Sequence, residues 1–456
     1  MGEEGFVIRS TRVLTPTGLW DGAVVVRGEK IAAVVAPGAL PAGLPVLDVG
    51  KKVVTPGVVD CHAHINEPGR TEWEGFETAT RAAAAGGITT VVDMPLNSIP
   101  PTTTVEGLRA KARAAEGRCA IDYGFWGGVV PKNLLELDGL ADEGVTGFKC
   151  FLIESGVEEF PHVQREHLQR AMPLLAHRRL PLIVHAELEH AKAPASTDPR
   201  RYAGYLASRP KSWENEAVRM MVELCRATRC AVHIVHLSSA DALADLAAAR
   251  SEGLPVTAET CPHYLTFAAE EIADGATHFK CAPPIREAEN RERLWRGLTE
   301  GRIDLVVSDH SPCTPALKKL EEGAFPDAWG GISSLQLSLS AVWTGMRQRG
   351  LELSKLARWM CEAPAWLAGL SQKGAIAPGR DADLVVFDPE AGFAVEPAMI
   401  QHRHRLTPYE GRLLFGRVET TFLRGRKIFE RGHLIGRPSG RRLRRPLRMR
   451  GSDAHP

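Results

Sequence analysis

Eight short apolar runs, each suited to a β-strand, recur through the middle of this 456-residue chain with helix-forming segments between them. The runs are Val58–His62, Thr89–Asp93, Tyr123–Trp126, Gly147–Phe151, Leu182–His185, Val232–His236, Val256–Glu259 and Leu305–Asp309. Segments such as Glu74–Ala85, Arg165–Ala176 and Ser239–Ser251 are rich in alanine or charged residues, as surface helices are. Alternating strands and helices build parallel βα units. Eight such units predict a (β/α)8 TIM barrel, and because no glycine-rich dinucleotide fingerprint follows any run, an open doubly wound sheet is disfavoured.

The two ends of the chain differ in texture from the middle. Phe6–Ile8, Ala23–Val26 and Ile31–Val34 are β-rich runs near the N-terminus, and similar runs return at Asp383–Phe387 and Val418–Leu423. We therefore expect a small β-sandwich domain formed from residues 1–54 and 371–435, and a barrel at 55–370. Residues 436–456 are polar and basic, which predicts a solvated, disordered tail, with an anion-binding patch as the alternative. The basic residues of this tail include Arg441, Arg442, Arg444, Arg445, Arg448 and Arg450.

Composition disfavours several classes of partner. The formal net charge of +1 gives no overall field that would attract nucleic acid or an anionic membrane. No apolar run approaches the ~20 residues of a membrane-spanning helix, and Met1–Gly5 lacks the basic and apolar regions of a secretory signal. The nine cysteines have no paired spacing, which argues against a disulfide framework. We therefore expect a cytoplasmic protein that acts on a small molecule.

Residue types that bind metals fall at or near the C-terminal ends of five of the eight runs. The first run is followed by a His-X-His pair, whose side chains point to one side because a strand has a period of two. The residues are His62, His64, Lys149, His185, His236 and Asp309. In a barrel these ends meet at one face, where barrel enzymes hold their chemistry. Satisfied polar residues at a strand end would explain the first pair alone, but five such ends are costly to bury unpaired, so the sequence predicts a metal site.

Lys149 is the unusual member of this set, because an ammonium group repels a cation. A buried lysine, however, has a lowered pKa and offers a neutral amine. Such an amine can take up CO2 and become a carbamate, an anion with two oxygens that can bridge two metals. The alternative is an unmodified lysine that is ion-paired with Asp309.

These residues, the split β domain and the string Lys373–Val386 resemble the amidohydrolase superfamily, and within it the cyclic amidases. The cyclic amidases are dihydroorotases, hydantoinases or dihydropyrimidinases, and allantoinases. The resemblance implies two divalent ions, zinc by default, with manganese, cobalt or iron as alternatives. It also implies a homotetramer, which is common among the relatives.

The resemblance further assigns a role to each candidate ligand. His62 and His64 would hold the more buried metal, and His185 and His236 the more exposed one. Carboxylated Lys149 would bridge the two metals. Asp309 would bind the buried metal and transfer protons.

Longer strings point to one subgroup. Residues 64–75, 93–98, 147–152, 307–313 and 328–332 are similar to allantoinases. Dihydroorotases carry an arginine two residues after the second histidine to grip a substrate carboxylate, and here that position is Asn66. Hydantoinases carry a tyrosine five residues after the bridging lysine, and here that position is Glu154. The resemblance therefore implies hydrolysis of allantoin in purine catabolism, with a hydantoinase or dihydropyrimidinase as the alternative and a non-catalytic scaffold as a rival from another class.

The sequence also suggests which residues contact the substrate and what roles the residues near the ligands have. The resemblance and the polarity of the side chains point to Asn66, Asn97, Ala282, Gly330 and Gly331 as substrate-binding positions. We expect His233 to be a packing residue and His310 to face away from the metals or to support a metal ligand. For His263, support of a metal ligand and a purely structural role are both open. Cys61 and Cys150 are expected to be small buried apolar fillers. Trp73 and Trp329 are expected to pack on a loop.

Overall fold

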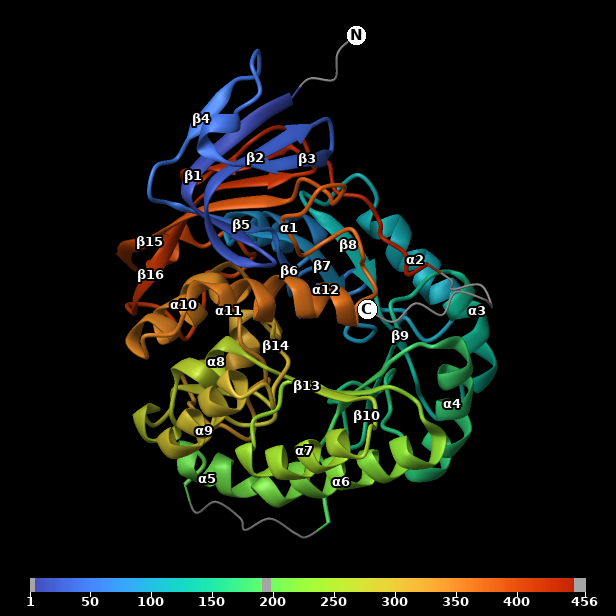
Figure 1. Ribbon diagram of the computed structural model, residues 1–456. Coiled ribbons are helices and arrows are strands. Elements are labelled where there is room, and N and C mark those ends of the chain that lie inside the picture. Colours follow the sequence, from blue (N-terminus) through green and yellow to red (C-terminus); the bar gives the residue numbers. More distant parts are fainter. Residues whose placement is uncertain (1–4, 191–197, 447–456) are drawn as a thin grey trace.

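The middle of the molecule is a ring of parallel strands surrounded by helices (Figure 1). The structure is a computed structural model that describes residues 5–190 and 198–446. Three strands of the ring pair in the order β6 (Val58–Ala63), β7 (Ile88–Asp93) and β8 (Asp122–Phe125). The others pair in the order β9 (Gly127–Gly128), β10 (Phe148–Phe151), β11 (Leu182–His185), β12 (Val232–Ile234), β13 (Val256–Thr260) and β14 (Leu305–Val306).

Two local contacts turn these sheets into one closed barrel. β8 and β9 are successive parts of a single strand that is interrupted at Trp126. The backbone N–H of Trp126 donates to Asp93 O at 3.0 Å, an ordinary distance for such a hydrogen bond, so the pairing with β7 continues across the interruption. The ring closes where His64 N donates to His310 O at 2.8 Å, next to a parallel bridge between Ala63 and His310. The predicted TIM barrel is therefore confirmed.

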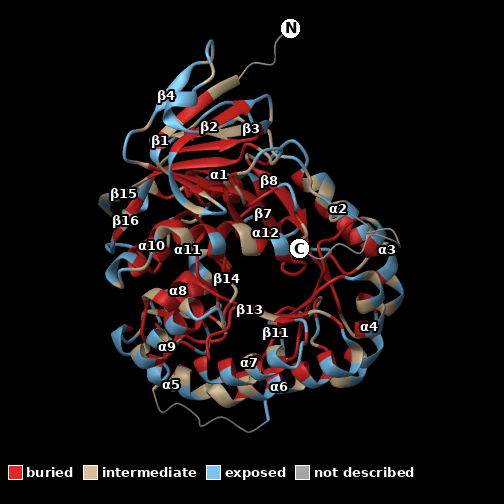
Figure 2. Cartoon of the chain, in the orientation of Figure 1, coloured by how far each residue is buried: buried red, intermediate tan, exposed pale blue. Residues whose placement is uncertain are grey.

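Helices cover the outside of the barrel and begin close to the predicted positions. The segments predicted as Glu74–Ala85, Arg165–Ala176 and Ser239–Ser251 contain α1 (Phe76–Ala85), α4 (Arg165–Arg178) and α7 (Leu243–Ser251). The others are α2 (Val105–Ala115), α3 (Leu137–Asp142), α5 (Tyr202–Ser208), α6 (Lys211–Thr228), α8 (Pro262–Thr266), α9 (Ala288–Thr299), α10 (Ser338–Gln348), α11 (Leu353–Ala357) and α12 (Ala363–Leu367). Figure 2 shows buried strands inside and exposed outer helix faces. Among the described residues, none of the helices combines the length and hydropathy needed to span a membrane.

The second layer of the molecule is a nine-stranded sheet built from both ends of the chain (Figure 1). Its order is β18 (His433–Leu434), β17 (Arg426–Glu430), β16 (Leu413–Leu423), β15 (Leu384–Ala394), β5 (Val53–Pro56), β1 (Gly5–Thr15), β2 (Gly18–Arg27) and β3 (Lys30–Val35), and β4 (Val46–Asp48) pairs with β1. The rings of Phe6 on β1 and Phe422 on β16 stack at 5.4 Å although two strands separate β1 from β16. The sheet therefore folds over an apolar core, as expected for the small β-sandwich domain.

A buried ionic cluster joins the two domains. Lys373 Nζ lies 2.6 Å from Asp122, 2.9 Å from Asp381 and 2.8 Å from Asp383, and Arg424 also pairs with Asp122. The three carboxylates are close enough to resemble a cation site. The ammonium of Lys373 occupies that role, so the cluster holds β8 of the barrel against the β domain without needing a metal.

The basic tail differs from the prediction as far as residue 446. Its backbone runs beside β8, where Tyr123 N donates to Arg441 O at 3.0 Å and Leu443 N donates to Tyr123 O at 2.6 Å. Arg445 Nη1 donates to Thr146 O at 2.9 Å and to Leu367 O at 3.0 Å. The expectation of disorder is wrong for residues 436–446, because these backbone and guanidinium donors find acceptors on the barrel. Residues 447–456 lie outside the described part of the chain.

Candidate metal centre

The six predicted ligand residues meet at the C-terminal end of the barrel, and all are buried. His62 Nε2 lies 3.1 Å and His64 Nε2 lies 3.6 Å from Asp309 Oδ1. The ring centroids of His62 and His236 are 5.4 Å apart, and those of His236 and His185 are 4.6 Å apart. One compact cluster therefore contains residues from the first, fifth, sixth and eighth strand units.

Two of these residues, which the sequence places at strand ends, lie beyond the strands of the structure. β12 ends at Ile234 and β14 ends at Val306, so His236 and Asp309 stand in the loops that follow. Both have left-handed backbones, with φ of 39° and 44°. Because a non-glycine residue in this region is strained, neighbouring contacts must hold each backbone in place.

Several buried polar atoms in the cluster have no hydrogen-bond partner among the described residues. They include Lys149 Nζ and His236 Nδ1. Each such atom costs about 1–3 kcal/mol when it is left without a partner. Imidazole nitrogens and carboxylates are common ligands of zinc and similar ions. The donor set therefore fits a metal centre, which would satisfy the atoms that the protein leaves unpaired.

The electrostatics of the cluster favour the ligand forms of Lys149 and Asp309. Burial lowers the pKa of Lys149 to about 8, so the neutral amine is accessible near that pH. Burial would raise the pKa of Asp309, but the surrounding histidines, His62 first, outweigh it and hold that pKa well below its ordinary value. Among the described residues, no ion pair joins Lys149 to Asp309. The alternative of a simple lysine–aspartate pair therefore has no support.

Two carboxylates that the sequence reasoning did not single out support the histidines. Glu187 Oε2 lies 2.7 Å from His185 Nε2, and Glu259 contacts His62 Nδ1. Burial would raise the pKa of Glu259, but His62 and His233 outweigh it and lower that pKa to about 2. The sequence does hold a signal for each: Glu187 follows a strand-end histidine by two residues, and Glu259 stands in an apolar strand, where a charged residue needs a partner.

The other histidines near the cluster have three different environments. His233 is buried, as expected of a packing residue, and both ring nitrogens are paired: Nε2 lies 2.9 Å from Glu259 Oε2, and Nδ1 lies 2.7 Å from Thr257 Oγ1. His310 Nδ1 accepts from Ser334 N at 3.2 Å. His263 is buried with neither ring nitrogen paired among the described residues.

Comparison with known proteins shows the family to which the chain belongs. The family model described as "Amidohydrolase family" matches residues 53–428. The chain belongs to the amidohydrolase family. Among its relatives are an allantoinase of Streptomyces avermitilis, 53% identical over 98% of this chain and 100% of the relative, and one of Arabidopsis thaliana, 46% identical over 93% and 88%. A solved L-hydantoinase (dihydropyrimidinase) from Arthrobacter aurescens is 31% identical, with a TM-score of 0.88 over 97% of this chain and 100% of that one.

The predicted substrate-binding residues of this amidohydrolase lie around the same end of the barrel. Asn66 and Asn97 are buried, and their Oδ1 atoms lack partners among the described residues. Asn97 Nδ2 lies 3.4 Å from His64 Nδ1. Gly331 N donates to Lys280 O at 2.8 Å, and a side chain at this glycine would collide with Ser311 O. The residue also has a φ of 145°, so a glycine is required there.

Gly330, two tryptophans and two cysteines are the remaining predicted residues at this end of the barrel. A Cβ atom placed on Gly330 would lie 3.9 Å from Ala282 N, so the two predicted loop segments are neighbours. The rings of Trp73 and Trp329 pack edge to face with centroids 4.8 Å apart, as expected of loop packing. Cys61 and Cys150 are buried within apolar clusters, which confirms their prediction as fillers.

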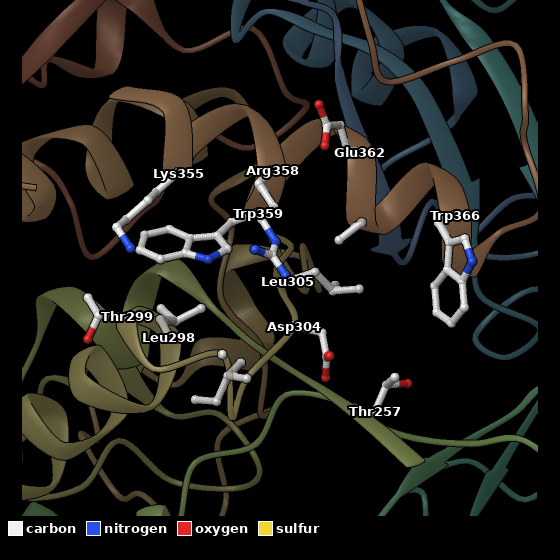
Figure 3. A pocket seen from close by; sticks show the side chains of 13 residues that line it. Thr257, Leu298, Thr299, Asp304, Leu305, Lys355, Arg358, Trp359, Glu362 and Trp366 are labelled. Carbon is white, nitrogen blue, oxygen red and sulfur yellow. The ribbon is translucent and has the colours of Figure 1, made fainter. Parts of the chain in front are cut away.

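A cavity of about 310 Å³ opens at the opposite end of the barrel of this amidohydrolase (Figure 3). It is lined by residues from the beginnings of β13 and β14, including Thr257 and Leu305, and by Arg358, Trp359 and Trp366. None of the six candidate ligands lines it. The cavity is therefore separate from the candidate metal centre.

Proposed function

We propose that this protein is an allantoinase, which hydrolyses the cyclic amide of allantoin to allantoate. The observation that carries the proposal is the 53% identity to an allantoinase over 98% of the chain, together with the buried cluster of unpaired ligand atoms. The solved hydantoinase is more distant, at 31% identity. The identity difference favours allantoinase over the hydantoinase alternative.

The proposed centre holds two divalent ions, with zinc as the expected metal. His62 and His64 would hold one ion, and His185 and His236 the other. When bound, the ions would supply a water acidified toward a pKa of about 7 and positive charge beside the attacked carbonyl. The unpaired Nδ1 atom of His236 supports this assignment.

Lys149 is proposed to be carboxylated and to bridge the two halves of the centre. Its neutral amine would attack CO2 to form a nitrogen–carbon bond, and it would lose one proton to give the carbamate anion. Complete burial and the absence of a hydrogen-bond partner for Nζ within the described residues support this role. The pKa of about 8 makes the reactive amine available without strong base.

Asp309 is proposed to move the proton during ring opening. Water adds its oxygen to the amide carbonyl carbon, and the bond from that carbon to the ring nitrogen breaks. Asp309 would take the proton of the water and deliver it to the ring nitrogen, which is a poor leaving group as an anion. The low pKa of Asp309 keeps its carboxylate ionised at neutral pH, so its oxygens carry no proton before the reaction.

Substrate choice is proposed to depend on uncharged polar groups around the centre. Asn66 stands where a dihydroorotase needs arginine, and burying a substrate carboxylate without a cation is costly. Allantoin is uncharged and rich in amide and ureido groups. The unpaired Oδ1 atoms of Asn66 and Asn97 could accept hydrogen bonds from it, and backbone groups of Ala282, Gly330 and Gly331 could add others. Glu154 does not replace the hydantoinase tyrosine, because its side chain is 78% exposed.

A substrate panel tests this proposal. On metal-replete protein we expect kcat/KM to fall in the order allantoin, then hydantoin or dihydrouracil, then dihydroorotate. The reason is that a site built to pair polar groups penalises analogues that lack them. If dihydrouracil or a 5-substituted hydantoin is turned over faster than allantoin, the protein is a hydantoinase or dihydropyrimidinase instead.

The assembly and compartment are also proposals. A homotetramer is proposed from the resemblance to other cyclic amidases, and light scattering on the purified chain would measure it. A cytoplasmic location is proposed because all nine cysteines are buried and free, which suits a reducing compartment.

A further inference from the structure

One buried carboxylate contacts two of the candidate ligands at once. Glu259 stands on β13, and its Oε1 atom contacts His62 Nδ1 and lies 3.2 Å from the backbone nitrogen of His236. Its Oε2 atom lies 2.9 Å from His233 Nε2, and His233 Nδ1 lies 2.7 Å from Thr257 Oγ1. The contacts form a continuous chain from the candidate metal centre into the interior of the barrel.

Donors and acceptors along this chain have one consistent arrangement. An ionised carboxylate only accepts, so His62 must donate from Nδ1 and His233 from Nε2. In the neutral imidazole, His62 Nε2 then carries the lone pair, on the side that faces Asp309, 3.1 Å away. His233 Nδ1 accepts from the hydroxyl of Thr257. Glu259 therefore selects the His62 tautomer that can bind a metal.

The same carboxylate also holds a strained piece of backbone. His236 has a φ of 39°, a left-handed conformation that costs about 1–3 kcal/mol for a residue other than glycine. Its backbone N–H donates to Glu259 Oε1. The ring of His236 is therefore presented to the cluster from a backbone that Glu259 helps to fix.

Glu187 offers a natural comparison. It lies 2.7 Å from His185 Nε2, and Arg209 holds it from the other side with contacts of 3.0 and 2.7 Å. Both glutamates are buried. Among the described contacts of the six candidate ligands, Glu187 reaches only His185, whereas Glu259 reaches His62 and His236.

We propose that Glu259 is a positioning residue that couples the two halves of the metal centre, by fixing the ring of His62 in one half and the backbone of His236 in the other. This inference rests on the proposed metal centre. It assigns a different task to Glu187, which positions one histidine of one half. Loss of Glu259 should therefore weaken both metals, and loss of Glu187 only one.

Metal retention by full-length protein separates these two tasks. Zinc-loaded wild type, Glu187→Gln and Glu259→Gln would be dialysed against increasing dipicolinate, and zinc per chain would be measured. Substitution of a group that orients a metal ligand lowers metal affinity by about 10–100-fold. We expect that loss for both ions in Glu259→Gln and for a single ion in Glu187→Gln.

A spectroscopic readout distinguishes positioning from general loss of structure. In the cobalt-substituted proteins, Glu259→Gln should change the visible absorption of both ions, whereas Glu187→Gln should change that of one. With its amide facing His233, the glutamine still presents an oxygen to His62 and His236 but loses the negative charge that makes both hydrogen bonds strong. His233 can then donate from Nδ1 to the Thr257 hydroxyl, so the side chain is accommodated. Glu259→Gln should therefore fold, with circular dichroism as the check.

Thr257 provides a second, independent variant. It ends the chain of hydrogen bonds that runs through Glu259 and His233, and it lines the cavity in Figure 3. Thr257→Val alone should leave zinc retention within about twofold of wild type. In the Glu259→Gln background it removes the acceptor for His233 Nδ1, so zinc retention should fall a further several-fold.

If Glu259→Gln weakens the binding of one ion or of neither, or if both glutamine variants behave alike, the coupling role is wrong. If wild type binds no zinc or cobalt, the proposed metal centre itself is wrong.

Discussion

Replacement of Lys149 by alanine should remove both metals and lower kcat by at least about a thousandfold, because water activation and charge stabilisation are lost together. The side chain is buried, and its Nζ atom has no hydrogen-bond partner among the described residues. No structural ion pair is therefore broken by the change. Metal content and turnover of allantoin, measured on the same preparation, check the result.

Chemical rescue gives this prediction a specific control. A short-chain carboxylic acid in excess should restore part of the metal content and activity of Lys149→Ala, because its carboxylate can fill the place of the carbamate. In Lys149→Arg the guanidinium fills that space. This variant should be inactive, and the added acid should not restore its activity. An alanine variant that keeps two metals and near-normal turnover would remove Lys149 from the centre.

Asp309→Asn should lower kcat by at least about a hundredfold, since proton transfer by a positioned side chain is typically worth 10²–10⁴-fold. The asparagine keeps an oxygen that can bind a metal but cannot carry the proton. Asp304→Asn, at the other end of the same strand, is the matched control, because Asp304 pairs with Arg250 away from the cluster. The measurement is kcat for allantoin together with metal content. Retained metal with an unchanged kcat would exclude Asp309 from proton transfer.

Much of the architecture could be predicted because each strand of the barrel has a local signature. Apolar runs bounded by turns located β6, β7, β8, β10, β11 and β13 within a few residues. β12 and β14 are shorter than predicted, since the chain turns into left-handed conformations at His236 and Asp309. Hydropathy carries no sign of such a turn at a non-glycine residue.

The supporting network could not be predicted in the same way, because it depends on contacts between distant segments. His62 and Glu259 are separated by 197 residues, yet their side chains meet inside the barrel. His233 was expected to be a packing residue because its side chain faces away from His236 along the strand. The carboxylate and hydroxyl that it meets come from the neighbouring strand, β13. Composition likewise suggested a disordered tail at residues 436–446, whereas its donors bind carbonyl groups on the barrel.

The most direct test of the proposed function is turnover of allantoin by purified protein whose metal content is measured before and after treatment with a chelator. We predict that allantoin is converted to allantoate by protein that holds two divalent ions per chain. Activity should disappear as the ions are removed and return when zinc, manganese or cobalt is restored. Full activity in metal-free protein, or no turnover of allantoin by protein holding two ions, would contradict the account.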